Sequence, residues 1–158
     1  MSNAIVDKFM RKAIELSVDN VAHGGGPFGA VIARGDELIA TGVNNVTRQN
    51  DPTAHAEVCA IREACHRLGT FDLSGCTIYS SCEPCPMCLS AIYWAHLDKL
   101  YYANTKQDAD AIGFSDDFIY KEFELTPEQR ALPSENTHRD EALAAFRAWA
   151  DKDDKIEY

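Results

Sequence analysis

The sequence lacks any long apolar run. Among its 158 residues, no stretch approaches the roughly 18 consecutive apolar residues that a membrane-spanning helix needs. The first ten residues also lack a positively charged region followed by an apolar block, so we expect no secretory signal. Internal repeats and low-complexity segments are missing as well. These absences favour a single cytoplasmic domain over residues 1–158, a length that supports a hydrophobic core without disulfides.

Basic residues are scarce. Lys and Arg number 15 against 25 Asp and Glu, which gives a net charge of −10 at pH 7. The excess lies mainly in residues 107–158, which hold 6 basic and 14 acidic groups. Because a negative field repels phosphate backbones, we expect no nucleic acid as partner. Since no apolar run is long enough for a span, we expect no membrane partner either.

The six cysteines are unevenly distributed. Three of them crowd into the segment Cys82-Glu83-Pro84-Cys85-Pro86-Met87-Cys88. Without a secretory signal, this clustering favours a metal site in a reducing compartment over three disulfides. The remaining three fall in apolar patterns and are predicted to be core residues: Cys59, Cys65 and Cys76.

Apolar periodicity predicts helices that alternate with strands. The expected helices cover residues 5–22, a stretch from Asp51-Pro52 to Gly69, residues 86–95 and residues 139–150. The expected strands cover residues 30–33, 37–40, 76–80 and 99–103, and residues 44–51 are expected to be irregular. A turn at Arg34-Gly35-Asp36 joins the first two strands into a hairpin. The order predicts a layered α/β domain around one mixed sheet.

Two short segments carry metal-ligand chemistry. His55-Ala56-Glu57 lies near the start of one expected helix, and Pro84-Cys85-Pro86-Met87-Cys88 lies at the start of the next. Zinc prefers four tetrahedral nitrogen and sulfur ligands, and a catalytic site keeps one position for water. His55, Cys85 and Cys88 supply three. The combined pattern H-x-E…P-C-x-x-C is the signature of zinc nucleobase deaminases, so we predict one zinc ion.

Glu57 requires a particular geometry to act beside that zinc. Residues i and i+2 of a helix point about 200° apart, so His55 and Glu57 meet one metal only if it lies beyond the helix N-terminus. There the Glu57 carboxylate would take a proton from water and pass it to a leaving amine. Cys82 is the alternative fourth ligand, which would make the zinc structural; we expect Glu83-Pro84 to turn it away.

The sequence resembles the cytidine-deaminase-like zinc enzymes and, within them, the small Bacillus-type class of bacterial guanine deaminases. The resemblance covers nearly the whole chain, more loosely in residues 124–148. It rests on segments 26–32, 44–47, 50–58, 81–88, 91–95 and 118–122, and on the Glu157-Tyr158 ending.

That resemblance implies a fold and a reaction. The fold is a three-layer α/β/α domain with a central mixed sheet, and the chain forms a homodimer that exchanges its C-terminal segment, about residues 138–158. The reaction, part of purine catabolism, is hydrolysis of guanine to xanthine and ammonia. A zinc-bound hydroxide attacks C2, and Glu57 shuttles the protons.

The resemblance also assigns residues to the substrate. Asn44 would bind the purine edge, Phe28 would stack on the ring, and Trp94 would line the pocket. Asp116 would bind the base and carry a second proton. The family tends to have a second acid just before this position, where this chain has Ser115, so Asp117 stays open as a choice. Tyr158 would close the partner's active site. The plain alternatives are a solvated acidic turn for the two aspartates and core packing for Phe28 and Trp94.

Four other functions remain open on the sequence. A deaminase of another small base or a triazine, such as cytosine or ammeline, differs by only a few pocket contacts. A tRNA adenosine deaminase shares the zinc motifs but needs basic surface, which residues 107–158 lack. A zinc-stabilised binding module would have no need of Glu57. A thiol oxidoreductase would use the clustered cysteines without metal.

Overall fold

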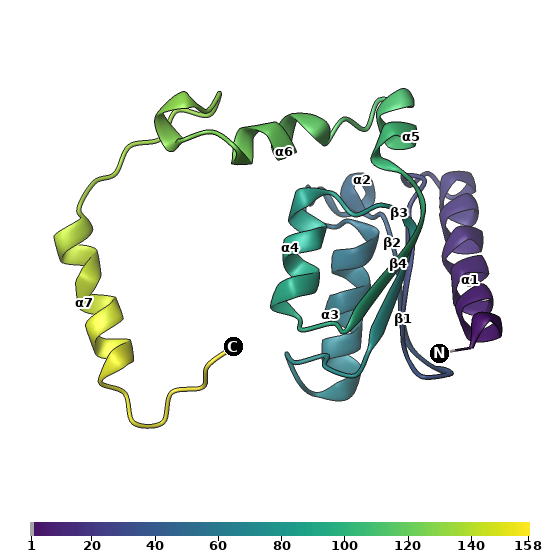
Figure 1. Cartoon of the computed structure of the whole chain (residues 1–158), viewed down its shortest axis with the longest axis horizontal. Coiled ribbons are helices and arrows are strands. Elements are labelled where there is room, and N and C mark those ends of the chain that lie inside the picture. Colours follow the sequence, from purple (N-terminus) through teal and green to yellow (C-terminus); the bar gives the residue numbers. More distant parts are fainter. Residues whose placement is uncertain (1) are drawn as a thin grey trace. The chain divides into compact units, whose positions relative to one another are not determined.

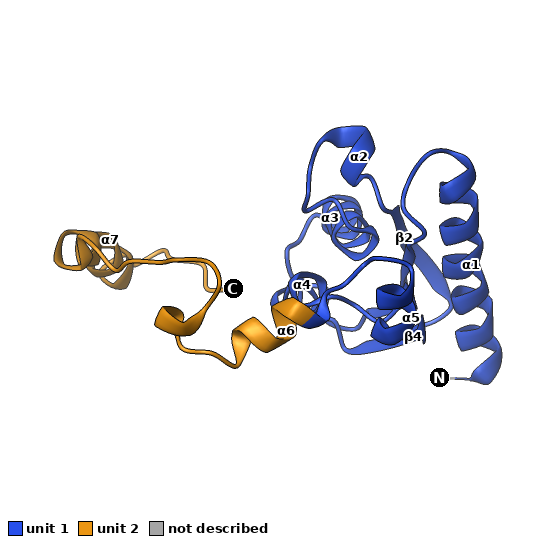
Figure 2. Cartoon of the chain, turned by 90° about the horizontal axis from the view of Figure 1, so that it is seen from above, with its two compact units in different colours: residues 1–117 blue, residues 118–158 orange. Residues whose placement is uncertain are grey.

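The computed structural model describes residues 2–158 and divides the chain into two units, residues 1–117 and 118–158 (Figure 2). The first unit is built on a four-stranded sheet of β1 (Gly29–Arg34), β2 (Glu37–Val43), β3 (Thr77–Cys82) and β4 (Lys99–Asn104), in the order β2-β1-β3-β4. β1 is antiparallel to both β2 and β3, whereas β3 and β4 are parallel. The predicted hairpin and mixed sheet are therefore confirmed.

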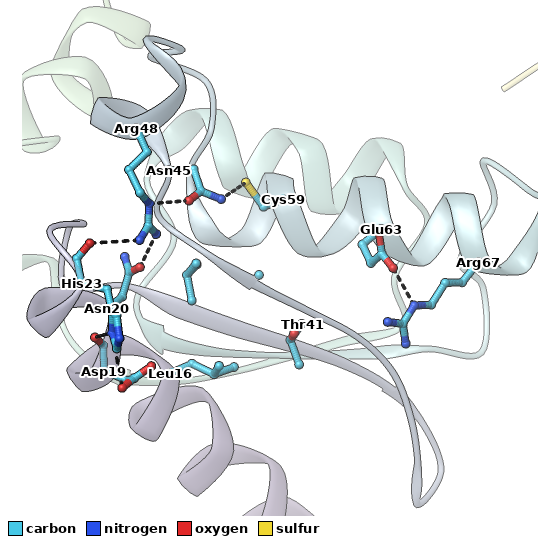
Figure 3. Close-up of a pocket in the computed structure, with 12 residues that line it drawn as sticks. Leu16, Asp19, Asn20, His23, Thr41, Asn45, Arg48, Cys59, Glu63 and Arg67 are labelled. Atoms are coloured by element: carbon cyan, nitrogen blue, oxygen red, sulfur yellow. Dashed lines mark hydrogen bonds and ion pairs between the residues drawn. The ribbon is translucent and has the colours of Figure 1, made fainter.

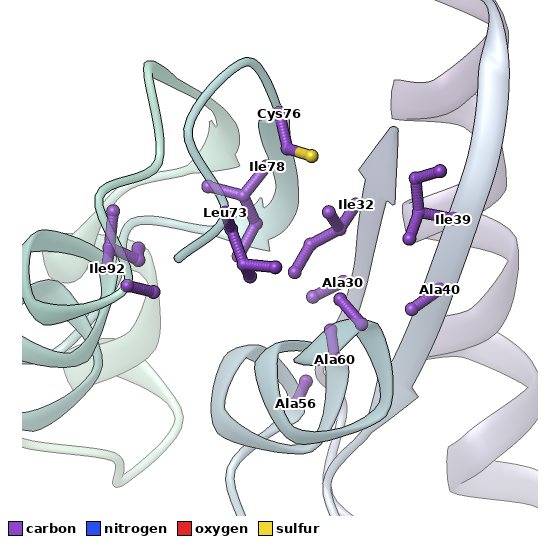
Figure 4. Close-up of a cluster of buried hydrophobic side chains, with 12 residues drawn as sticks. Ala30, Ile32, Ile39, Ala40, Ala56, Ala60, Leu73, Cys76, Ile78 and Ile92 are labelled. Carbon is purple, nitrogen blue, oxygen red and sulfur yellow. The ribbon is translucent and has the colours of Figure 1, made fainter. Parts of the chain in front are cut away.

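Helices cover both faces of this sheet (Figure 1). α1 (Asn3–Ala22) lies on one face, and α3 (Ala56–Leu68) and α4 (Pro86–Trp94) lie on the other. Strand β1 divides its side chains between the two layers, because successive residues of a strand point to opposite faces. Ala30 and Ile32 join the cluster under α3 and α4 (Figure 4), while Val31 and Ala33 pack with α1. This arrangement confirms the three-layer α/β/α fold.

The layer beneath α3 is packed closely enough to require glycine. A Cβ at Gly42 on β2 would overlap the carbonyl oxygen of Ala56 and lie 2.5 Å from the amide nitrogen of Ala60. Both atoms are backbone, so they cannot move aside as a flexible side chain would. Gly42 therefore sets the distance between β2 and the first turn of α3, which carries His55 and Glu57.

The start of α3 is a correction to the sequence prediction. The helix begins at Ala56 with His55 as N-cap, and Asp51-Pro52 lies outside it. The Asp51 carboxylate accepts bonds from the Thr53 amide, at 2.8 Å, and from the Thr53 hydroxyl, at 2.7 Å, so it closes a local turn. The segment predicted as irregular also holds a short helix, α2 (Val46–Gln49), which ends at Asn50 in the left-handed conformation.

The chain beyond β4 has more helix than the sequence prediction allowed. α5 (Lys106–Ala111), α6 (Asp117–Phe123) and the 3₁₀ turn η1 (Pro127–Gln129) were not expected, while α7 (Arg139–Ala150) matches the predicted final helix. Neither α6 nor α7 has a buried residue. Among the described residues, none of the helices combines the length and apolar character that crossing a bilayer would take.

Candidate functional site

Two helix N-termini bring the three predicted metal ligands together. His55 is the N-cap of α3, Cys85 is the N-cap of α4, and Cys88 lies in the first turn of α4. The His55 Nδ1 atom is 3.5 Å from both sulfur atoms, and all three ligand atoms lie within 4.8 Å of one another. Cys85 Sγ also accepts from the Cys88 amide at 3.5 Å. The two segments, 30 positions apart in the sequence, thus converge as predicted.

These distances fit a tetrahedral zinc ion. Zn–N and Zn–S bonds of about 2.0 and 2.3 Å at the tetrahedral angle place a nitrogen and a sulfur ligand about 3.5 Å apart. The two observed separations of 3.5 Å match that edge. The three residues can therefore hold zinc through His55 Nδ1 and two sulfurs, with a fourth position for a non-protein ligand.

The electrostatics of the sulfur pair point to the same cation. Hydrogen bonds from Cys88 and His55 lower the pKa of Cys85 to about 4. The pKa of Cys88 is raised, first by its bond to the Cys85 sulfur, then by burial and by the negative charge of Glu57. One thiolate is thus stable beside its neighbours, and a second needs a positive charge to balance it. A divalent cation supplies that charge.

Glu57 is buried directly behind these ligands. Its side chain is 5% exposed, and its Oε1 accepts a 3.0 Å hydrogen bond from the Ser80 hydroxyl of β3. Burial raises the pKa of the carboxyl group. Because His55 is the N-cap and Glu57 follows two residues later, both lie at the open end of α3. Both residues therefore have the position in the helix that an end-on metal would require.

Cys82 does not belong to the ligand group. Its Sγ donates to the Thr105 carbonyl oxygen at 3.7 Å, and burial raises the pKa of its thiol to about 11. Among the described residues, the cluster that could hold a metal ion consists of His55, Cys85 and Cys88 alone. Of the other three cysteines, Cys76 is buried and Cys59 and Cys65 are half-buried.

Asn44 and Phe28 lie on neighbouring loops at the end of the β1–β2 hairpin. The backbone N–H of Asn44 donates to the Phe28 carbonyl oxygen at 3.2 Å. The Asn44 side chain is buried, and its Oδ1 accepts from the Val46 amide at 3.2 Å. Phe28 meets Phe114 edge-on with ring centroids 4.9 Å apart. That aromatic contact ties the loop of Phe28 to the segment that carries Asp116.

The two aspartates of the acidic pair are both half-buried and differ in the surroundings of one oxygen atom. Oδ1 of Asp116 is buried and has no hydrogen-bond partner, whereas Asp117 forms the first turn of α6. Burial, aided by the negative charges of Cys85 and Glu83, raises the pKa of Asp116. An unpaired buried carboxylate oxygen is costly unless a ligand donor meets it. A fully solvated acidic turn would not bury this oxygen atom of Asp116.

The remaining predicted substrate residues are exposed. Trp94 ends α4 with 64% of its surface exposed, so core packing is the wrong interpretation of this residue. Tyr158 is 73% exposed and belongs to the second unit.

Sequence reasoning missed two polar partners of the site. Ser80, which donates a hydrogen bond to Glu57, lies in a strand that the sequence predicts only as a buried element. Asn20 donates to the Asn44 carbonyl oxygen and falls on the buried stripe of α1 with Phe9, Ala13 and Ser17. A polar residue at the helical spacing of a buried stripe was the signal available for Asn20.

Fold and site together define a zinc-dependent deaminase. Residues 4–104 match the family model described as the cytidine and deoxycytidylate deaminase zinc-binding region, and the chain belongs to this family. A guanine deaminase of Bacillus subtilis (strain 168) is 50% identical over 153 residues, which are 96% of this chain and 98% of that protein.

A solved structure and a second relative extend the comparison. The X-ray structure of guanine deaminase from Bacillus subtilis superposes with a TM-score of 0.94 and 48% identity, covering 100% of this chain and 99% of the other. A tRNA-specific adenosine deaminase of Aquifex aeolicus (strain VF5) is 39% identical over 95 residues, 60% of this chain and 63% of its own length. The likeness to the guanine deaminase thus includes the C-terminal residues that the family model leaves out.

Proposed function

We propose that this protein hydrolyses guanine to xanthine and ammonia. The observation that carries the proposal is the His55–Cys85–Cys88 cluster with Glu57 buried beside it, in a chain half identical to a guanine deaminase over nearly its full length. Water adds at C2, the exocyclic amino group leaves as ammonia, and no other reactant is consumed.

Glu57 moves the protons of this reaction. Zinc, when bound, supplies a Lewis acid that makes water a nucleophile at neutral pH. The Glu57 carboxylate takes the proton that this water loses and gives it to the amino nitrogen that leaves. The hydrogen bond from Ser80 fixes Oε1, so the carboxylate is oriented before substrate binds.

The loops beside the metal ligands recognise the purine. Because the Asn44 Oδ1 is engaged by Val46, its amide NH₂ is the group we expect to donate to a ring acceptor. The unpaired Oδ1 of Asp116 accepts from the N–H donors of guanine and can carry a second proton. Phe28 supplies an aromatic face for the ring, and Trp94 lines the entrance.

The charge of the chain favours a free base over RNA. A tRNA loop needs basic surface, and this chain has a net charge of −10. Its likeness to the tRNA-specific adenosine deaminase covers 60% of the chain, whereas that to the guanine deaminase covers 96%. We place the reaction in the cytoplasm, where a reducing environment keeps the six free thiols available.

The C-terminal segment supports a homodimer that exchanges this part of the chain. α7 carries Phe146 and Trp149, which are 75% and 42% exposed, and no residue of the helix is buried. An isolated helix of 12 residues is marginal in water, so its apolar face needs a cover. We infer that residues 138–158 dock on a second copy and that Tyr158 closes the partner's pocket.

The experiment compares ammonia release from guanine, adenine, cytosine, adenosine, cytidine and ammeline by the zinc-loaded protein. We expect release from guanine well above the others, with xanthine as the matching product. Release from another base alone would keep the mechanism and reject guanine. If the zinc-loaded protein releases ammonia from none of the six compounds, small-base deamination is rejected, and RNA substrates are tested next.

A further inference from the structure

A polar network joins the end of α1 to the loops that carry Asn44 and Phe28. It forms one end of a cavity of about 520 Å³ between α1, β2, α2 and α3 (Figure 3). The central residue of this polar network is Asn20, which is 3% exposed. The network lies behind Asn44 and includes none of the zinc ligands.

Asn20 bonds two separate loops with one amide group. Its Nδ2 donates to the Gly26 carbonyl oxygen at 2.7 Å and to the Asn44 carbonyl oxygen at 2.9 Å. The Gly26 carbonyl also accepts from the Phe28 amide at 2.8 Å. A Cβ at Gly26 would lie 3.1 Å from Cγ of Asn44, so the two loops are in close contact. The Asn20 amide therefore sets the separation of Asn44 and the segment that leads to Phe28.

Arg48 of α2 holds Asn20 in this orientation. Its Nη2 donates to Asn20 Oδ1 and, at 3.4 Å, to the Asn44 carbonyl oxygen. Its Nη1 donates to the His23 carbonyl oxygen at 3.3 Å, and its Nε donates to Asn45 Oδ1 at 3.0 Å. Because Oδ1 of Asn20 accepts from the guanidinium, its NH₂ group must face the two carbonyls.

We propose that Asn20, held by Arg48, is a positioning residue for purine binding. The proposal rests on the proposed function, in which Asn44 and Phe28 contact the base. Asn20 and Arg48 do not reach the substrate; they keep the Asn44 amide in register with the ring. Their loss should therefore weaken substrate binding while leaving zinc and Glu57 in place.

The first test removes Arg48, because it is exposed and its loss spares the core. Arg48→Ala should raise KM for guanine about tenfold, with kcat within about twofold and zinc content unchanged. Arg67→Ala is the matched control: this second arginine lines the same cavity but bonds Glu63 and the Ile39 carbonyl, away from Asn44. It should retain the wild-type KM. Equal effects of the two variants would overturn the proposal.

A double-mutant cycle separates positioning from general destabilisation. If Arg48 acts through Asn44, the variant Asn44→Ala/Arg48→Ala should have the same kcat/KM as Asn44→Ala alone. A loss from Arg48→Ala that persists in full on the Asn44→Ala background would reject the coupling. Asn20→Asp, which keeps the shape but removes both donors, should give the same pattern as Arg48→Ala.

A spectroscopic measurement tests the network without activity. The side-chain ¹⁵N–¹H signal of Asn44, assigned by its absence in Asn44→Asp, should shift or broaden in Arg48→Ala and stay in place in Arg67→Ala. An unchanged Asn44 signal in Arg48→Ala overturns the proposal. If the wild-type protein releases ammonia from a base other than guanine, the proposed function fails and the same cycle is run on that base. If it acts on none, the Asn44 signal decides.

Discussion

At the scale of single residues, the hydrogen bond from Ser80 to Glu57 makes it possible to test the proposed proton transfer apart from metal binding. Glu57 is buried and bonded through Oε1, yet it is not one of the three metal ligands. Glu57→Gln keeps the size of the side chain and its acceptor for Ser80 but cannot carry a proton. We expect this variant to retain zinc and to lose activity roughly a thousandfold. Metal analysis and ammonia release measure the two effects, and a fully active variant would reject the proton shuttle.

The neighbouring aspartates give a second prediction at this scale. Asp116 has a buried, unpaired oxygen, whereas Asp117 forms the first turn of α6. Asp116→Asn should lower kcat/KM for guanine about 10- to 100-fold, the cost of losing a hydrogen bond to a charged group, without changing zinc content. Asp117→Asn is the control and should stay within about twofold of wild type. The reverse order would move the substrate role to Asp117.

The grouping of His55, Cys85 and Cys88 could be predicted from the sequence because short motifs carry these residues. The motifs at His55 and Cys85 need only two helix starts brought side by side. Ser80 and Asn20 could not be assigned, because their partners lie 23 and 24 positions away in the chain. The buried, unpartnered oxygen of Asp116 is likewise a feature of the folded chain that no local pattern reports.

At the scale of elements, the close contact between β2 and α3 supports the site from behind. Gly42→Ala places a methyl group against the backbone of Ala56 and Ala60. We expect it to lower the free energy of unfolding by at least about 2 kcal/mol and to reduce zinc retention, since α3 carries His55. Thermal melts and metal analysis check this expectation.

The control for that prediction is a glycine with open surroundings. Gly35 lies in the β1–β2 turn with φ +61°, and a Cβ there would meet no atom within 4 Å. Gly35→Asn, which tolerates this conformation, should cost less than about 1 kcal/mol and leave zinc in place. Equal destabilisation by the two variants would show that the contact under α3 is unimportant.

Element types were more predictable than the exact start of α3. Short strand-like runs predict β1 to β4, and period-3.6 patterns predict α1 and α7, whereas Asp51-Pro52 has the residues of a helix start but lies before the helix. Asp51 bonds Thr53 and so closes a turn before the helix. The difference matters for function, because it makes His55 the N-cap and opens the end of α3 to the metal.

For the whole molecule, a zinc ion held by His55, Cys85 and Cys88 would join the N-termini of α3 and α4. A ligand that binds only the folded state stabilises it by mass action, by about 4 kcal/mol at a thousand times its dissociation constant. Treatment with a chelator should abolish ammonia release and lower the melting temperature, and added zinc should restore both. Glu57→Gln should show the same thermal shift, since it keeps the ligands. A melting temperature insensitive to chelation would contradict a structural contribution from the metal.

The C-terminal segment gives a prediction for the assembly. If residues 138–158 dock on a second copy, light scattering should report a dimer, and deletion of this segment should yield monomers with little activity. Removal of Tyr158 alone should keep the dimer and lower kcat/KM about tenfold if the tyrosine closes the partner's pocket. Unchanged kinetics after that removal would reject the closing role. The polar, charged tail agrees with the proposed partner, but the sequence does not indicate the surface that would receive it.

The metal-ligand residues and the proposed substrate-binding residues lie on different parts of the first unit. His55, Cys85 and Cys88 are held by α3 and α4, while Phe28, Asn44 and Asp116 lie on loops outside these helices. If these loops bind the base as proposed, substitutions in them should change which ring the enzyme accepts and leave the zinc ligands in place. For protein engineering, this chain therefore offers a small scaffold in which selectivity for the substrate ring can be varied through the loops while the zinc site is kept.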